Sequence, residues 1–206
     1  MKLKRLLPAL LSALFSVVSV SAAAQSAPPG LTVEKNGNVT NYRANGNLSE
    51  VQNVSCIPLT QAKNTFTPPD LYKGAVDCLA RDNFDASAKL FALAGIYARF
   101  DAKRVSDVTA RQAGPVLIMN TFSAVPTDKK AKLGEALNLM QKNHERLRQL
   151  CTEVNAIGMP NYYPSYMIHH GMRAFKGNPH EGALVNNFDA VGVWKNLQST
   201  YLHCPS

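Results

Sequence analysis

The chain lacks the short motifs that mark several common classes of enzyme. It has no G-x-S-x-G sequence, so the nucleophile elbow of an α/β-hydrolase is not supported. It has neither G-x-x-x-x-G-K-[ST] nor G-x-G-x-x-G, the glycine-rich patterns whose backbone amides hold nucleotide phosphates. It also has no H-E-x-x-H, the helical spacing that brings two histidines to one zinc ion. No reaction can be assigned from motifs, and we expect no bound cofactor.

Clustered positive charge is also absent. The 206 residues include 22 Lys and Arg against 14 Asp and Glu, which gives a net charge of +8. These cations are scattered and form no stripe with interleaved aromatic residues, so we expect no binding of nucleic acid. A mild positive charge still favours an acidic partner.

Only one long apolar run is present, and it stands at the N-terminus. Cations at residues 2–5 precede an apolar run from Leu6 to Val20, and small residues from Ser21 to Ala24 follow it. This is the pattern of a secretory signal peptide cut after Ala24. The run is shorter than the ~20 residues that span a bilayer. We therefore expect residues 1–24 to be removed, leaving a soluble, periplasmic or secreted protein without stable membrane insertion and with a net charge of +5.

The four cysteines fit this export prediction. Cys56, Cys78, Cys151 and Cys204 are an even number, which in an exported chain indicates two disulfides. No C-x2-C spacing suggests a metal site. Three pairings are compatible with the sequence. We favour Cys56–Cys78 with Cys151–Cys204, because each bridge would tie an irregular segment to a helix.

The chain divides into two parts after the signal peptide. Residues 25–66 are rich in Asn and Pro, and residues 32–42 predict a small β-hairpin with Asn36-Gly37 as its tight turn. From residue 67 onward, apolar residues recur at helical spacing and no strand pattern interrupts them. We expect a mainly α protein with about seven helices in one bundle-like or repeat-like domain over residues 67–206.

Cap residues and chain breakers set the expected limits of these helices. Thr127 is a good N-cap, Asn143 and Asp189 can also cap helices, and Gly114-Pro115 should break or kink a helix that begins near Asp101. The predicted helices begin near residues 69, 85, 101, 127, 143, 164 and 190, with a buried apolar piece over 116–122.

Residues 70–95 resemble a helical hairpin of the tetratricopeptide or Sel1-like kind. The second helix of such a repeat carries an aromatic residue at its entry, a small residue three positions later, and a further aromatic residue and alanine. The matching positions here are Phe84, Ser87, Phe91 and Ala94. The resemblance covers about one eighth of the chain, without a second copy, and it implies a binding scaffold.

The stretch NYYPSYMIHHGM, residues 161–172, holds the candidate binding residues. A continuous helix from Pro164 would bury Ile168, Gly171, Met172 and Phe175 on one face, since each residue advances by about 100°. Tyr166, His170 and Arg173 would then form an outward stripe, with His169 at its edge. Tyr162 and Tyr163 at the helix entry would extend this surface, since Tyr and Arg are enriched at binding hot spots. Alternatively, the stripe is a solvated helix face or packs under residues 176–188. In that case the two tyrosines at the helix entry would pack the entry turn against the core.

Two functions from different classes follow. The first is a protein-binding protein that docks a partner in the cell envelope, such as an inhibitor or an immunity-type protein. The second is a metal-assisted hydrolase that uses His170 and His180. Paired carboxylates are sparse, and Glu145 and Glu153 are expected to belong to a solvated helix face.

Overall fold

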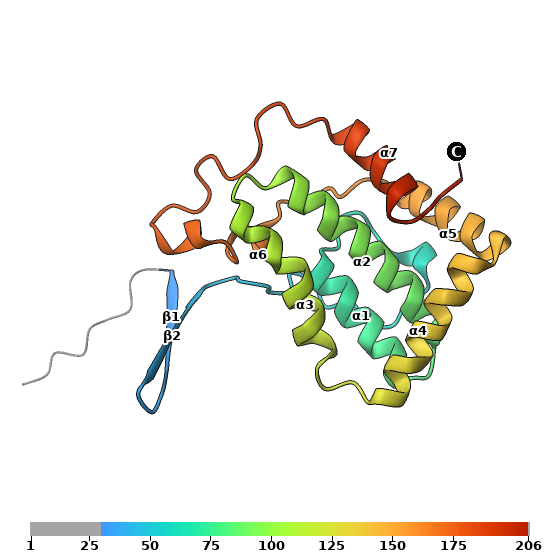
Figure 1. The fold of residues 1–206 in the computed structure, drawn as a ribbon, viewed down its shortest axis with the longest axis horizontal. Helices are drawn as coiled ribbons and strands as arrows, with labels where there is room; N and C mark the ends of the chain where they lie inside the picture. The colour runs from blue at the N-terminus through green and yellow to red at the C-terminus, as the bar shows by residue number, and fades with distance from the viewer. Residues whose placement is uncertain (1–29, 206) are drawn as a thin grey trace, which may run out of the picture.

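A helical hairpin lies at the centre of the structure, which is a computed structural model that describes residues 30–205 (Figure 1). Its two arms are α1 (Pro68–Ala80) and α2 (Phe84–Arg104), which pack along each other. Small residues allow this approach: the buried Ser87 hydroxyl donates to the carbonyl of Ala75 at 2.9 Å. The predicted signal peptide lies outside the described residues.

The start of α1 is fixed by a fully buried carboxylate. Asp70 Oδ2 accepts the backbone amide of Thr67 at 2.8 Å, and Oδ1 accepts the amides of Val51 and Gln52 at 2.8 and 2.9 Å. A carboxylate in the first turn also interacts favourably with the helix dipole. One side chain therefore caps the helix and holds the irregular N-terminal segment against it.

The second helix is longer than the sequence predicted. α2 continues without a break to Arg104, so a separate helix beginning near Asp101 was a wrong prediction. A short 3-10 turn (Val108–Gln112) follows, and then α3 (Ala113–Phe122). Gly114-Pro115 does not interrupt a helix, because it lies in the first turn of α3. Backbone amides in a first turn have no intrahelical hydrogen-bond acceptor, so proline is tolerated there.

The apolar piece over 116–122 was predicted to be buried, and this is only partly right. Leu117 and Phe122 are buried, but Met119 is 65 % exposed. α3 is a surface helix, since only one of its faces packs against α1 and α2.

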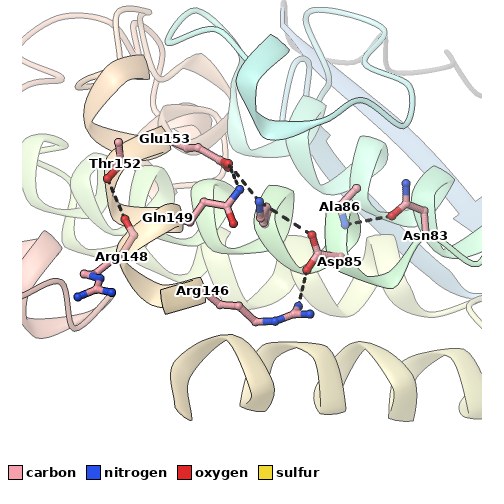
Figure 2. A network of polar contacts seen from close by, with 9 residues as sticks. Asn83, Asp85, Ala86, Arg146, Arg148, Gln149, Thr152 and Glu153 are labelled. Atoms are coloured by element: carbon pink, nitrogen blue, oxygen red, sulfur yellow. Dashed lines mark hydrogen bonds and ion pairs between the residues drawn. The ribbon is translucent and has the colours of Figure 1, made fainter. Parts of the chain in front are cut away.

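Two further helices cover the other side of the hairpin. α4 (Thr127–Lys142) and α5 (His144–Ile157) meet at Asn143, whose side chain accepts the amides of Glu145 and Arg146 as predicted. Figure 2 shows the polar network that joins α5 to the start of α2. Glu153 accepts a hydrogen bond from Gln149, and Arg146 pairs with Asp85 at 2.9 Å.

The expectation of a solvated face was wrong for Glu153. Its side chain is 12 % exposed and pairs with Lys89 of α2 at 3.1 Å. Glu145 is exposed, as expected. The charged face of α5 therefore packs partly against a neighbouring helix, which periodicity alone does not reveal.

The C-terminal part contains two more helices and much irregular chain. α6 (Ser165–Ile168) has four residues, and α7 (Ala190–Thr200) packs on α2 with its N-cap at Asp189, as predicted. A 3-10 turn (Met172–Phe175) lies between them. Seven α-helices are thus present in the described chain, and the mainly α fold is confirmed. None of them, within residues 30–205, has the length and apolarity needed to cross a bilayer.

The N-terminal hairpin is also present. β1 (Leu31–Asn36) pairs antiparallel with β2 (Val39–Ala44), and Figure 1 shows the pair projecting from the helical body. The register pairs Asn36 with Val39, so the central turn residues are Gly37 and Asn38, one position later than predicted. Gly37 has a φ of 58°, which suits glycine at the first central position of a tight turn.

Both favoured disulfides are confirmed. Cys56 is bonded to Cys78 in α1, and Cys151 in α5 is bonded to Cys204 beyond α7. Each bridge ties an irregular segment to a helix, which was the reason for favouring this pairing.

Removal of the Cys151–Cys204 bridge should destabilise the protein substantially. The bridge spans 53 residues of sequence. We expect Cys151→Ala/Cys204→Ala to lower the free energy of unfolding by about 2–4 kcal/mol, because the unbridged unfolded chain gains conformational freedom. Urea unfolding followed by circular dichroism measures this. An unchanged midpoint would show that the bridge does not constrain the unfolded chain.

Candidate functional site

The stretch 161–172 does not form one continuous helix. α6 ends at Ile168, a turn follows, and Gly171 is extended with a ψ of 157°. The side chains of Thr109 and Asp107 accept the backbone amides of Met172 and Arg173 at 2.8 and 3.0 Å. In a continued helix, these two amides would donate to backbone carbonyls one turn earlier. The side chains of Thr109 and Asp107 take the place of those carbonyls.

The predicted Tyr166–His170–Arg173 stripe is therefore wrong as an exposed surface. Tyr166 is buried, at 1 % exposure, while Met172, predicted to be buried, is 57 % exposed. His170 is half-buried, and its Nδ1 lies 2.9 Å from Asn47 Oδ1. The prediction of buried and exposed faces was wrong because the step of about 100° per residue applies only within a helix, and α6 ends at Ile168.

Arg173 binds the segment 176–188 rather than facing solvent. Its guanidinium donates to the Gly182 carbonyl at 2.8 Å and to Ser106 Oγ at 3.1 Å. This arrangement corresponds to the alternative in which the side chain packs under a loop. Of the five predicted binding residues, Tyr163 is the one that is exposed, at 43 %.

Tyr162 and Tyr166 share one buried acceptor, which the sequence did not reveal. Both hydroxyls donate to Asp101 Oδ2 at 2.9 Å. Arg104 donates from Nε to Asp101 Oδ1 at 2.8 Å, and its guanidinium lies over the Tyr162 ring at 5.1 Å. We call Asp101, Arg104, Tyr162 and Tyr166 the Asp101 cluster. The one sequence signal was the Asp101–Arg104 spacing of three, which many exposed helices share.

Burial dominates the electrostatics of this cluster. Desolvation raises the pKa of Asp101 to about 6, although the Arg104 charge and the two tyrosine hydroxyls oppose this shift. Desolvation, followed by the Asp101 charge, also raises the pKa of Tyr162 and Tyr166 well above the usual range, so both hydroxyls stay protonated and donate. Asp101 is fully buried, and the cluster joins α2 to the 162–166 segment without offering a reactive group to solvent.

A second group of side chains lies at the surface. His169 Nε2 is 3.3 Å from His180 Nε2, and His180 Nδ1 is 3.2 Å from the Tyr163 hydroxyl. We call these three residues the histidine pair and its tyrosine. His169 and His180 border a cavity of 280 Å³ whose lining also includes Asn45 and Gly177.

The structure does not bring together the residues of the hydrolase alternative. His180 contacts His169, while the neighbouring His170 points to Asn47. Within residues 30–205, no group of three or more His, Cys, Asp or Glu side chains is placed to share a metal ion.

Two hollows lie side by side between α1 and α3. They measure 370 and 730 Å³, and Val76 and Thr121 line both. The first is mainly apolar and extends to Val125 and Lys129, while the second opens toward Arg43 and Lys73. We call these two adjoining hollows the α1–α3 groove.

The α3 side of this groove carries no charge. The sequence has no charged residue from Ala113 to Thr127, although several of these residues are exposed. Among them, Thr121 lines both hollows and Ala124 lines the first, while Met119, which lines neither, exposes 65 % of its surface. Exposed apolar surface on a helix that borders a groove is typical of an interaction site.

Comparison of the chain with family models, curated proteins and solved structures gives no match. The resemblance of residues 70–95 to a tetratricopeptide or Sel1-like hairpin therefore stays a prediction. The packing of α1 on α2 is common to many helical proteins and does not distinguish a repeat from any other helix pair.

Replacement of Asp101 by Asn should change the pH dependence of stability. A carboxyl whose folded pKa is raised stabilises the folded state most below its unfolded pKa of 3.8, and this contribution is lost as the pH rises through about 6. Asn does not titrate. The stability difference between wild type and Asp101→Asn should therefore shift by about 2 kcal/mol in favour of the variant between pH 4.5 and pH 7.

Urea unfolding at both pH values measures this difference. Asp128→Asn is the matched control, since Asp128 is exposed on α4 and its replacement removes the same charge. If the Asp101→Asn difference were constant with pH, or moved in the opposite direction, the desolvation explanation would be wrong.

Proposed function

We propose that this chain is an exported protein that binds a protein partner in the cell envelope, and that the partner docks in the α1–α3 groove. The binding role was first predicted from the lack of catalytic motifs, the repeat-like hairpin and a tyrosine-rich surface. The α1–α3 groove replaces that tyrosine-rich surface in the proposal, because Tyr166 is buried and Arg173 donates to a backbone carbonyl of the same protein.

The single observation that carries the proposal is the uncharged, exposed side of α3. A surface helix normally carries charged residues on its solvent face. Residues 113–127 carry none, and Thr121, which lines both hollows, belongs to this segment. Interface cores are depleted of charged residues, so a partner that covers this face would bury it favourably.

The polar end of the groove indicates the charge of the partner. Arg43 and Lys73 line it together with one acidic residue, Glu50. The chain as a whole is cationic. An acidic segment of the partner at this end, with an apolar side chain against α3, would match both halves of the groove.

Export is supported by two independent features. Residues 1–24 have the charge and apolar pattern of a signal peptide. All four cysteines form disulfides, which persist in oxidising compartments such as the periplasm. An inhibitor or immunity-type protein that covers a partner's surface is the version of this function we favour.

Site-specific crosslinking tests the proposed surface. A photoreactive residue at Thr121, which lines both hollows, should give a discrete crosslinked product in envelope extract of the source cells. The matched control places the same residue at Leu139, which is 49 % exposed on α4 and does not line the groove. Equal products from both positions, or none from Thr121, would contradict docking at this groove.

A direct binding measurement then completes the test. With the crosslinked partner purified, Thr121→Glu should weaken binding by at least about tenfold, since it places a charge in a desolvated contact. Leu139→Glu should change binding by less than about twofold. Circular dichroism of both variants checks that each is folded.

A further inference from the structure

We propose that His169 and His180 together form a binding site for one divalent cation of the Zn²⁺ or Cu²⁺ class. The site is separate from the α1–α3 groove and does not depend on the proposed function. It rests on the relative placement of two ring nitrogens that come from different segments, the turn after α6 and the 176–188 segment.

The distance between the two nitrogens matches a shared metal ion. Imidazole nitrogens bind Zn²⁺ at about 2.0–2.1 Å, so two of them at a tetrahedral angle lie about 3.3 Å apart. In the structure the two Nε2 atoms face each other at 3.3 Å, with the ring planes at 72°. Imidazole suits Zn²⁺ and Cu²⁺, whereas carboxylate and water ligands suit Mg²⁺ and Ca²⁺.

Tyr163 acts as an outer contact for one of the two ligands. A metal-bound histidine usually donates its second ring N–H to an oxygen, which fixes the tautomer and the ring orientation. His180 Nδ1 lies 3.2 Å from the Tyr163 hydroxyl, so it can donate there when Nε2 holds the metal. Tyr163, predicted as a binding residue, would thus position His180.

His169 is oriented by the packing of its ring against Gly46. A Cβ added at Gly46 would lie 2.5 Å from His169 Nδ1, so only glycine leaves room for the ring in this position. His169 Nδ1 is buried and has no hydrogen-bond partner. Its proton in the metal-bound tautomer would be unpaired, which limits the affinity of the site.

The adjoining cavity leaves room for the remaining ligands. It measures 280 Å³ and borders both histidines, so water can complete the coordination. With two protein ligands and no third His, Cys, Asp or Glu placed nearby in the described chain, we expect affinity on the order of micromolar.

Calorimetric titration of the purified, untagged protein with ZnCl₂ and with CuCl₂ tests the site. We expect one equivalent to bind, with at least tenfold weaker binding in His169→Ala and in His180→Ala. His170→Ala is the matched control, because His170 is adjacent in sequence but contacts Asn47 instead, and it should bind as wild type does.

A structural readout accompanies the titration. The electron paramagnetic resonance spectrum of the Cu²⁺ complex should show two imidazole nitrogens in wild type and in His170→Ala, and at most one in His180→Ala. His180 is exposed, so its replacement should leave the fold intact, and circular dichroism verifies this. Absence of saturable binding, or equal binding by His180→Ala and wild type, would overturn the proposal.

Discussion

The carboxylate of Asp101 is the point on which the C-terminal half of this protein depends. Asp101 belongs to α2, and its carboxylate is fully buried. It accepts hydrogen bonds from two tyrosines in a segment about sixty residues later in the chain. Arg104 supplies the compensating charge. Because a buried carboxylate is costly without partners, the arrangement is stable only when the 162–166 segment is in place. The neighbouring His170 and Arg173 are then held by contacts of their own, to Asn47 and to Asp107.

A second buried carboxylate performs the same task at the start of α1. Asp70 gathers three backbone amides, which come from Val51, Gln52 and the N-cap residue Thr67. Disulfides add covalent ties between irregular segments and helices. The protein therefore orders its long irregular segments through polar and covalent contacts to a helical core. This leaves α3 at the surface, where it forms one wall of the α1–α3 groove.

Sequence reasoning succeeded where local chemistry determines structure. Asn143 and Asp189 cap helices as predicted, since caps act through short-range rules, whereas Thr127 was a wrong N-cap prediction because it is the first residue of α4 after Pro126. Both disulfides pair as favoured. Sequence reasoning failed in residues 164–175, where Asp107 and Thr109 compete for backbone amides from about sixty residues away. No local pattern reveals such a competitor. The candidate site was consequently found at Tyr163 but not at His169, and the exposed α3 was mistaken for a buried piece.

The Cys151–Cys204 bridge has a consequence for the order in which the two disulfides can form. Cys56 and Cys78 are 22 residues apart, so they can meet once α1 has formed. Cys204 follows α7, so its bond to Cys151 must wait until α7 and the residues after it have been synthesised. Until then the Cys151 thiol is free to react with other thiols and disulfides. The Cys151–Cys204 bond thus forms only in a chain that already contains all seven described helices.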